Sequence, residues 1–194
     1  MKLNFSRVQF IKSAPRVADK PTPALKELVF VGRSNVGKSS LINLLTGHPI
    51  AKVSGKPGKT IFLNYFSVDD KFYLVDAPGY GYTASGSRHT TNFSQMMEEY
   101  FKDNVNLKGV ILLLDSRHTP SSDDLAFYSF VKKTNYPLVI VLTKTDKLNQ
   151  KEAASFLKET ARLGLDLTDS IQTSTLEKRG FDDLQARLAQ LIGD

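Results

Sequence analysis

The sequence predicts a three-layer α/β fold, in which helices cover both faces of a mostly parallel β-sheet. Apolar runs of strand length alternate along the chain with segments whose apolar residues recur at helical spacing. The runs near the middle of the chain are apolar at nearly every position, which is typical of strands buried on both faces. With 194 residues, the chain is long enough for one domain whose core needs no crosslinks.

The elements are expected in a regular order. A continuous apolar run at 28–31 ends at Gly32 and predicts a buried strand, and a helix is expected at 39–45. Strands at 61–66 and 72–75 flank Asp69-Asp70-Lys71, which has the composition of a hairpin turn, so one strand should run antiparallel to the rest. Segments 46–60 and 78–91 are rich in Gly and other loop-forming residues and are expected to be loops. The remaining elements alternate, with helices at 93–101, 122–132, 151–163 and 184–192 and strands at 110–114, 138–142 and 171–173.

The composition favours a cytoplasmic protein with a polyanionic partner. The chain has no cysteine, which excludes disulfides and thiolate metal sites and indicates a reducing compartment. It shows neither an apolar signal segment nor an apolar run long enough to cross a bilayer, so no membrane partner is expected. The net charge of +6 favours partners such as RNA. Residues 1–24 are expected to form a basic N-terminal arm or an extension of the sheet edge, beside a main domain at 25–194. On charge alone, a solvated arm is preferred to a binding surface.

A phosphate-binding loop follows the first predicted strand. The run Gly32-Arg33-Ser34-Asn35-Val36-Gly37-Lys38-Ser39 matches G-x-x-x-x-G-K-[ST] at every fixed position. Glycines let the backbone curl so that its N–H groups face phosphate oxygens, and the following helix adds its positive N-terminal dipole. We expect Lys38 to reach the β- and γ-phosphates and Ser39 to bind Mg²⁺ through its hydroxyl.

A second motif indicates guanine as the base. Thr143-Lys144-Thr145-Asp146 follows the strand expected at 138–142, at the strand end where ligands bind in open α/β sheets. The Asp146 carboxylate can accept hydrogen bonds from guanine N1–H and from the 2-amino group, whereas adenine offers neither donor. The Lys144 stem can lie along the face of the base. The structural alternative for Asp146 is that it caps the next helix. A separate segment, Ser174-Thr175-Leu176, is expected to offer backbone N–H groups to the base carbonyl.

Two loop segments have the features of a nucleotide-dependent switch. Asp76-Ala77-Pro78-Gly79 ends a predicted strand, so Asp76 can hold Mg²⁺ through water and the Gly79 N–H can sense the γ-phosphate. Thr60 lies in the Gly-rich loop before the hairpin and is either a Mg²⁺ ligand or simply the start of a strand. Loss of the γ-phosphate would release both loops.

The expected hydrolysis is slow. Tyr80 stands where a water-orienting glutamine often follows the glycine of this motif, and we interpret it either as a core aromatic or as a contact for RNA or protein. Asn35 either binds K⁺ beside the phosphates, which would supply charge stabilisation, or merely tolerates the tight turn.

These motifs resemble those of the P-loop GTPases of the translation-factor class, and specifically the EngB (YihA/YsxC) group of bacterial ribosome-assembly GTPases. The resemblance covers nearly the whole chain. Its distinctive features are the run Asp76-Ala77-Pro78-Gly79-Tyr80-Gly81-Tyr82 and Thr143 in place of the usual asparagine. The other matching segments are Gly32-Arg33-Ser34-Asn35-Val36-Gly37-Lys38-Ser39-Ser40, Pro57-Gly58-Lys59-Thr60 and the remainder of the base motif.

The resemblance implies a GTPase that binds GTP and GDP, with Ser39, Thr60 and Asp76 as Mg²⁺ ligands and Lys38, Thr60 and Gly79 as catalytic residues. It also implies a monomer that acts in assembly of the large ribosomal subunit, contacts its precursor and rRNA, and is required for normal growth and cell division. A signalling GTPase that binds only proteins is the alternative. The predicted nucleotide-binding residues are Gly32, Arg33, Ser34, Asn35, Val36, Gly37, Lys38, Ser39, Ser40, Pro57, Gly58, Lys59, Thr60, Asp76, Ala77, Pro78, Gly79, Thr143, Lys144, Thr145, Asp146, Ser174, Thr175 and Leu176.

Overall fold

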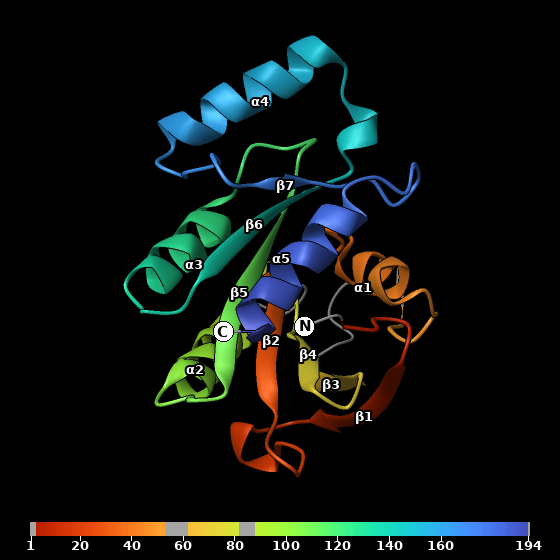
Figure 1. Ribbon diagram of the computed structural model, residues 1–194. Helices are drawn as coiled ribbons and strands as arrows, with labels where there is room; N and C mark the ends of the chain where they lie inside the picture. The colour runs from red at the N-terminus through yellow and green to blue at the C-terminus, as the bar shows by residue number, and fades with distance from the viewer. Residues whose placement is uncertain (1–2, 53–61, 82–87, 194) are drawn as a thin grey trace.

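The computed structural model describes residues 3–52, 62–81 and 88–193, and these form a seven-stranded sheet between two layers of helices (Figure 1). The strand order is β1-β3-β4-β2-β5-β6-β7, and β3 runs antiparallel to both of its neighbours while the other pairings are parallel. The predicted fold class is confirmed. The strands are β1 (Val8–Ala14), β2 (Lys26–Gly32), β3 (Leu63–Val68), β4 (Phe72–Asp76), β5 (Leu107–Asp115), β6 (Leu138–Thr143) and β7 (Ile171–Gln172).

The helices agree with the alternation that the sequence predicts, although several begin earlier than expected. They are α1 (Lys38–Thr46), α2 (Arg88–Phe101), α3 (Ser122–Lys132), α4 (Gln150–Arg162) and α5 (Phe181–Gly193), with short 3₁₀ turns η1 (Val17–Asp19) and η2 (Thr145–Lys147). No helix within the described ranges is long and apolar enough to span a membrane.

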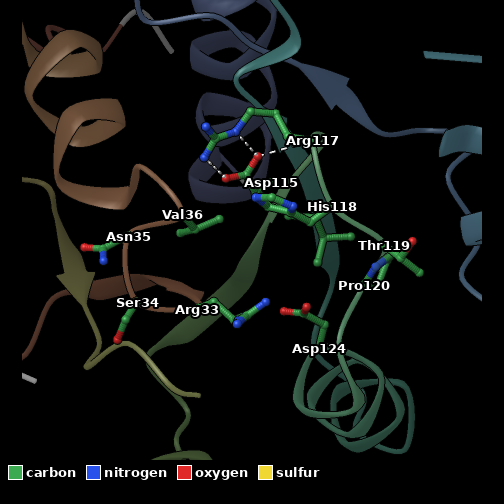
Figure 2. A pocket seen from close by; sticks show the side chains of 11 residues that line it. Arg33, Ser34, Asn35, Val36, Asp115, Arg117, His118, Thr119, Pro120 and Asp124 are labelled. Atoms are coloured by element: carbon green, nitrogen blue, oxygen red, sulfur yellow. Dashed lines mark hydrogen bonds and ion pairs between the residues drawn. The ribbon is translucent and has the colours of Figure 1, made fainter. Parts of the chain in front are cut away.

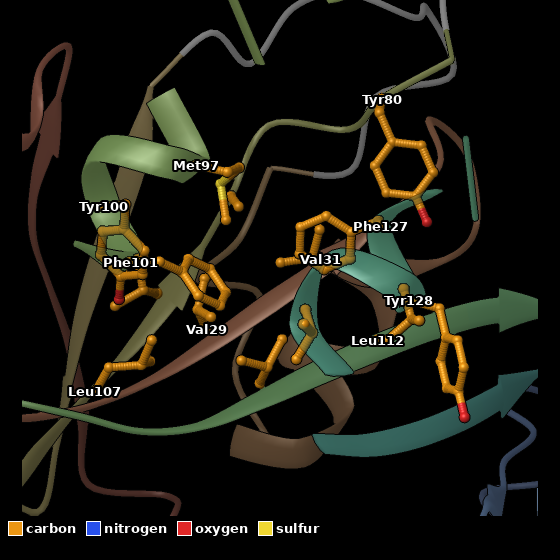
Figure 3. Close-up of a cluster of buried hydrophobic side chains, with 14 of the residues drawn as sticks. Val29, Val31, Tyr80, Met97, Tyr100, Phe101, Leu107, Leu112, Phe127 and Tyr128 are labelled. Carbon is orange, nitrogen blue, oxygen red and sulfur yellow. The ribbon is translucent and has the colours of Figure 1, made fainter. Parts of the chain in front are cut away.

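Successive residues of the central strand β2 point to opposite faces and build two separate cores. Val29 and Val31 pack with residues of α2 and α3, including Tyr100 and Phe127, in the cluster that Figure 3 shows. Leu28 and Phe30 pack on the other face, with α1 and α5. Since both faces of β2 are covered, its residues from Leu28 to Val31 are fully buried, and the carboxyl end of the strand is held rigidly where the phosphate-binding loop begins.

A tight hairpin joins β3 to β4, as the sequence predicts. Asp69 and Asp70 have φ values of 53° and 52°, so both central residues are left-handed, and Val68 pairs with Phe72 across the turn. The N–H of Lys71 donates to the carbonyl of Val68 at 3.0 Å, so Val68 to Lys71 form a four-residue turn with two left-handed central residues, a geometry whose twist matches the strands and that aspartate tolerates.

The N-terminal segment contains a strand that the sequence pattern does not reveal. Residues of β1 pair with β3 at the edge of the sheet, with an irregularity between Phe10 and Lys12. Much of the positive charge of this segment is also balanced in space, because Arg7 pairs with Asp69 and Asp70 of the hairpin and Lys20 pairs with the buried Glu27. The basic segment therefore lies against the sheet, and acidic residues of the sheet and its hairpin neutralise part of its positive charge.

Candidate functional site

The phosphate-binding loop connects the end of β2 to the start of α1 and depends on glycine at two positions. Gly37 has a φ of 104°, a left-handed conformation that side chains rarely adopt, and it caps the N-terminus of α1. A Cβ at Gly32 would lie 2.9 Å from Val36 Cγ1 and 3.0 Å from the carbonyl oxygen of Leu113. Asn35 is also left-handed, with a φ of 65°. The loop thus turns sharply at the carboxyl edge of the sheet and leads into a helix N-terminus.

Lys38 and Asp76 form a buried ion pair at the base of this loop. The side chain of Lys38 is 10% exposed and that of Asp76 is 5% exposed, and Lys38 Nζ contacts Asp76 Oδ1. Asp76 is the last residue of β4 and pairs in register with Phe30 of β2. Because Lys38 directly precedes Ser39, this pair brings the carboxylate to the first turn of α1, so two of the predicted Mg²⁺ ligands belong to neighbouring segments.

The segment after β4 runs parallel to the start of the phosphate-binding loop and is hydrogen-bonded to it. The N–H of Ser34 donates to the carbonyl of Tyr80 (3.0 Å), and the N–H of Tyr80 donates to the carbonyl of Gly32 (3.3 Å). A Cβ at Gly79 would lie 2.9 Å from Ser34 Oγ and 3.0 Å from Ser34 N, so only glycine allows so close an approach. The structure therefore brings the predicted residue Gly79 to the loop.

The Tyr80 side chain points into the protein interior. Tyr80 is 4% exposed, and its ring packs against Phe93 and Phe127. Its hydroxyl donates to Asp124 Oδ1 of α3 at 2.6 Å. Burial, followed by the charge of Asp124, raises the pKa of Tyr80 well above its usual value. Of the two interpretations of this residue, the core aromatic is the one that the structure supports.

The base motif is bonded directly to the phosphate-binding loop. Thr143 Oγ1 donates to the carbonyl of Val36 at 2.7 Å, and Lys144 Nζ donates to the carbonyl of Asn35 at 2.7 Å. Lys144 has a left-handed φ of 59°, which turns the chain from β6 into η2. The threonine in place of the usual asparagine thus still supplies a side-chain donor to the loop.

Asp146 is held by a neighbouring loop, and one of its buried oxygens accepts no well-aligned hydrogen bond from the part of the chain that the structure describes. Its Oδ1 accepts a hydrogen bond from Ser174 Oγ at 2.7 Å, while Oδ2 is buried and accepts none with suitable geometry from the described residues, although Lys147 Nζ lies 3.2 Å away. The bond from Ser174, together with the charge of Lys147, lowers the pKa of Asp146 and keeps the carboxylate ionised. A buried acceptor of this kind is the observation expected where a ligand supplies the donor.

Ser174 begins the segment predicted to offer backbone N–H groups to the base carbonyl, but its own N–H is already used within the protein. The N–H of Ser174 donates to the carbonyl of Arg179 (3.2 Å), and Ser174 acts through its hydroxyl on Asp146 instead. Thr145 joins the same two segments, since its N–H and its hydroxyl both donate to the carbonyl of Thr173, at 3.3 and 3.0 Å. Leu176 is 71% exposed beside this loop.

Four predicted residues, Pro57, Gly58, Lys59 and Thr60, lie outside the described residues, as does Tyr82. Their nucleotide and Mg²⁺ contacts stay predictions.

The structure adds Asp115 and Arg117, which sequence reasoning missed. Together with Arg33 and Asn35 of the loop they line a cavity of about 320 Å³ between the phosphate-binding loop and the segment joining β5 to α3 (Figure 2). Asp115 ends the apolar strand β5 at the same edge of the sheet as Asp76 and Thr143, and a polar residue at that point is the signal that could have identified it.

Comparison with known proteins agrees with this geometry. A family described as 50S ribosome-binding GTPase matches residues 27–144. A probable GTP-binding protein EngB from Petrotoga mobilis is 38% identical over 190 residues, which cover 97% of each chain, and one from Mycoplasma capricolum is 42% identical over 199 residues, covering 96% of this chain and 97% of the relative. The chain belongs to the EngB family of GTP-binding proteins. As a member of this GTPase family it binds guanine nucleotides and hydrolyses GTP.

Solved structures support the same EngB assignment at the level of the fold. The crystal structure of a probable GTP-binding protein engB has a TM-score of 0.65 and 26% identity, covering 86% of this chain and 98% of that one. Aquifex aeolicus Era bound to GDP and AlF4⁻ has a TM-score of 0.64 at 22% identity, covering 87% of this chain and 57% of that one, and therefore shows the shared fold alone.

Proposed function

We propose that this GTPase hydrolyses GTP slowly and acts as a molecular switch in assembly of the large ribosomal subunit. The observation that carries the nucleotide part of the proposal is the buried Oδ2 of Asp146, an ionised oxygen that accepts no hydrogen bond with suitable geometry from the described residues. Guanine N1–H and its 2-amino group are donors of the kind that this oxygen requires, whereas adenine offers neither and would leave it with Lys147 alone, 3.2 Å away. The ribosomal part is supported by the matching family, described as ribosome-binding, and by the net charge of +6.

In this proposal the phosphates lie along the loop that ends at Ser39. The backbone turns at Asn35 and Gly37, so that loop N–H groups and the N-terminus of α1 face the anion. Lys38 exchanges Asp76 for the β- and γ-phosphates, and the N–H of Gly79 reaches the γ-phosphate from the segment that already contacts Ser34. Lys38, Gly79 and Thr60 then supply the positioning and charge stabilisation that phosphoryl transfer requires.

The donor set fits Mg²⁺. The Ser39 hydroxyl and the Asp76 carboxylate are hard oxygen ligands on adjoining segments, with Thr60 as the proposed third ligand from outside the described residues. The cation would neutralise charge on the β- and γ-phosphates. K⁺ near Asn35 is a second candidate cofactor, and the left-handed φ of Asn35 suits the tight turn with or without it.

The orientation of Tyr80 supports a slow intrinsic rate. Its ring is buried and its hydroxyl already donates to Asp124 at 2.6 Å, so it does not replace the water-orienting amide of a glutamine. Without a glutamine at this position, a partner or a monovalent cation must orient the water or supply charge. This is the expected behaviour of a switch whose hydrolysis depends on its partner.

The switch itself rests on the contact between two segments. Ser34 of the loop and Gly79 of the next motif are already within van der Waals distance, so a γ-phosphate bound by one is sensed by the other. Hydrolysis would remove the group that holds the segment after Gly79 and the loop of Thr60, and the surface that they present would change.

Co-sedimentation with large ribosomal subunits tests the partner. We expect binding with a non-hydrolysable GTP analogue to exceed binding with GDP by about tenfold, and to fall steeply as salt rises. Lys12 of β1 and Lys52 are the basic residues proposed to face RNA, so Lys12→Ala and Lys52→Ala should weaken binding more than Lys158→Ala on α4, a charge-matched control far from β1 (Figure 1). Binding that ignores both nucleotide and salt would favour the protein-only alternative.

The same proposal places the protein in the cytoplasm and expects cells depleted of it to show defects in growth and division. They are expected to follow from a deficit of mature large subunits, so accumulation of subunit precursors must precede any division defect. Division failure with normal subunit profiles would contradict the proposed order.

A further inference from the structure

Asp115 lies at the junction of three segments of the nucleotide site. It ends β5, pairs in register with Thr143 of β6, and its side chain is 15% exposed. Its Oδ2 accepts a hydrogen bond from Lys144 Nζ at 2.8 Å. Both of its oxygens accept bonds from Arg117, at 2.8 and 3.0 Å, as Figure 2 shows. None of the motifs that define the site includes this residue.

Lys144 depends on Asp115 for its orientation. Its ammonium has two acceptors at almost equal distance, the carbonyl of Asn35 at 2.7 Å and Asp115 Oδ2 at 2.8 Å. A lysine stem has four rotatable bonds, and a single neutral carbonyl does not hold it in one rotamer. With the carboxylate on the other side, the stem is drawn across Gly37, where a Cβ would lie 3.8 Å from Lys144 Cε.

We propose that Asp115 is a positioning residue for guanine-nucleotide binding, which acts through Lys144. By fixing the ammonium it holds the Asn35 carbonyl, and with it the curvature of the phosphate-binding loop, and it places the lysine stem where the base is expected. One ion pair, between Asp115 and Lys144, which are 29 residues apart in the sequence, would thus support both the phosphate-binding loop and the base site. This proposal rests on guanine-nucleotide binding and is independent of the ribosomal partner.

The competing explanation is that Asp115 only neutralises Arg117 and stabilises the β5–α3 connection. Arg117 is 40% exposed and makes two side-chain bonds and one backbone bond to Asp115, so this explanation accounts for the same carboxylate. It differs in what it predicts for Arg117. If Asp115 serves Arg117, then removing either residue has the same consequence.

A double-mutant cycle with GDP as the probe separates the two explanations. We expect Asp115→Ala to raise the Kd for GDP about tenfold in the wild-type background and less than about twofold in a Lys144→Met background, because the residue through which it acts is then absent. Arg117→Ala should raise the Kd less than about threefold. Urea unfolding of each variant shows that the affinities belong to folded protein, and Asp115→Asn replaces Asp115→Ala in the cycle should the alanine variant fail to fold.

Three outcomes would overturn the proposal. Asp115→Ala with wild-type affinity would remove the effect altogether. An equal loss in the two backgrounds would show that Asp115 does not act through Lys144. An Arg117→Ala variant as weak as Asp115→Ala would assign the carboxylate to Arg117.

Discussion

The hydrogen bond from Tyr80 to Asp124 allows a sharp test of how the segment after β4 is held. Tyr80→Phe removes one hydroxyl and keeps the ring, whose centroid lies 5.4 Å from that of Phe93 and 6.0 Å from that of Phe127. Asp124 is 5% exposed, and its other oxygen accepts two bonds from Ser121, both at 2.7 Å. The substitution therefore leaves one oxygen of a buried carboxylate without its donor.

The expected cost follows from the charge of the acceptor. A hydrogen bond to a charged group contributes about 1.5–3 kcal/mol, so Tyr80→Phe should lower the free energy of unfolding by about 2 kcal/mol. For a domain of this size that corresponds to a fall in Tm of about 4–8 °C. Urea unfolding followed by circular dichroism, with a calorimetric Tm, measures both quantities.

Tyr128→Phe is the matched control. Its hydroxyl accepts a bond from the N–H of Asp166 at 3.2 Å, in which neither group is charged, so a loss of about 1 kcal/mol or less is expected. If Tyr80→Phe unfolds within 0.5 kcal/mol of the wild type, or if both variants lose the same amount, the argument that the buried carboxylate anchors this segment is refuted.

Three further predictions concern the base, the monovalent cation and pH. Asp146→Asn should weaken GTP binding by on the order of a hundredfold in calorimetric titration, because the amide cannot accept from both guanine donors, whereas the exposed Asp169→Asn should bind normally. GTP turnover should be faster in KCl than in NaCl if Asn35 helps to bind K⁺, and equal rates would exclude that role. Burial raises the pKa of Asp115, but hydrogen bonds from Arg117 and Lys144 outweigh it and lower the pKa to about 2. A carboxylate whose pKa is lowered on folding stabilises the fold fully above its unfolded pKa of about 3.9, and this stabilisation is lost as the pH falls toward 2. The unfolding free energy of the wild type should therefore exceed that of Asp115→Asn by about 2 kcal/mol at pH 6 and by about half as much at pH 3. A constant difference over this range would contradict the lowered pKa of Asp115.

Local patterns were enough to predict the central part of the fold. The run ending at Gly32 is apolar at every position because β2 is covered on both faces, and the two aspartates of the hairpin carry the turn geometry in their own side chains. The edge strand β1 has no such signal. Phe10 is 47% exposed and most of its neighbours are exposed as well, so burial imposes no alternation on that segment.

The site shows the same division between local and distant information. The phosphate-binding loop is predictable because its glycines meet local requirements of the backbone. A side chain at Gly32 would clash with Val36, and Gly37 has a left-handed φ. The role of Asp115 depends on the register that sets it beside Thr143, and the orientation of Tyr80 depends on a partner 44 residues away. Neither can be predicted from residue spacing, because each depends on which distant segments the fold brings together.

The ion pair between Lys38 and Asp76 explains why nucleotide and cation binding should be coupled in this protein. Both charges are buried, so neither can lose its partner without a large cost unless another partner replaces it. Phosphate oxygens can replace the carboxylate as the partner of Lys38, and a cation can replace the ammonium as the partner of Asp76. Either exchange alone leaves the other buried charge unpaired. The two exchanges are therefore favourable together and unfavourable singly. With Mg²⁺ as the proposed cation, a nucleotide that arrives with it would satisfy both residues at once, so we expect the complex of the two to bind more tightly than the nucleotide alone.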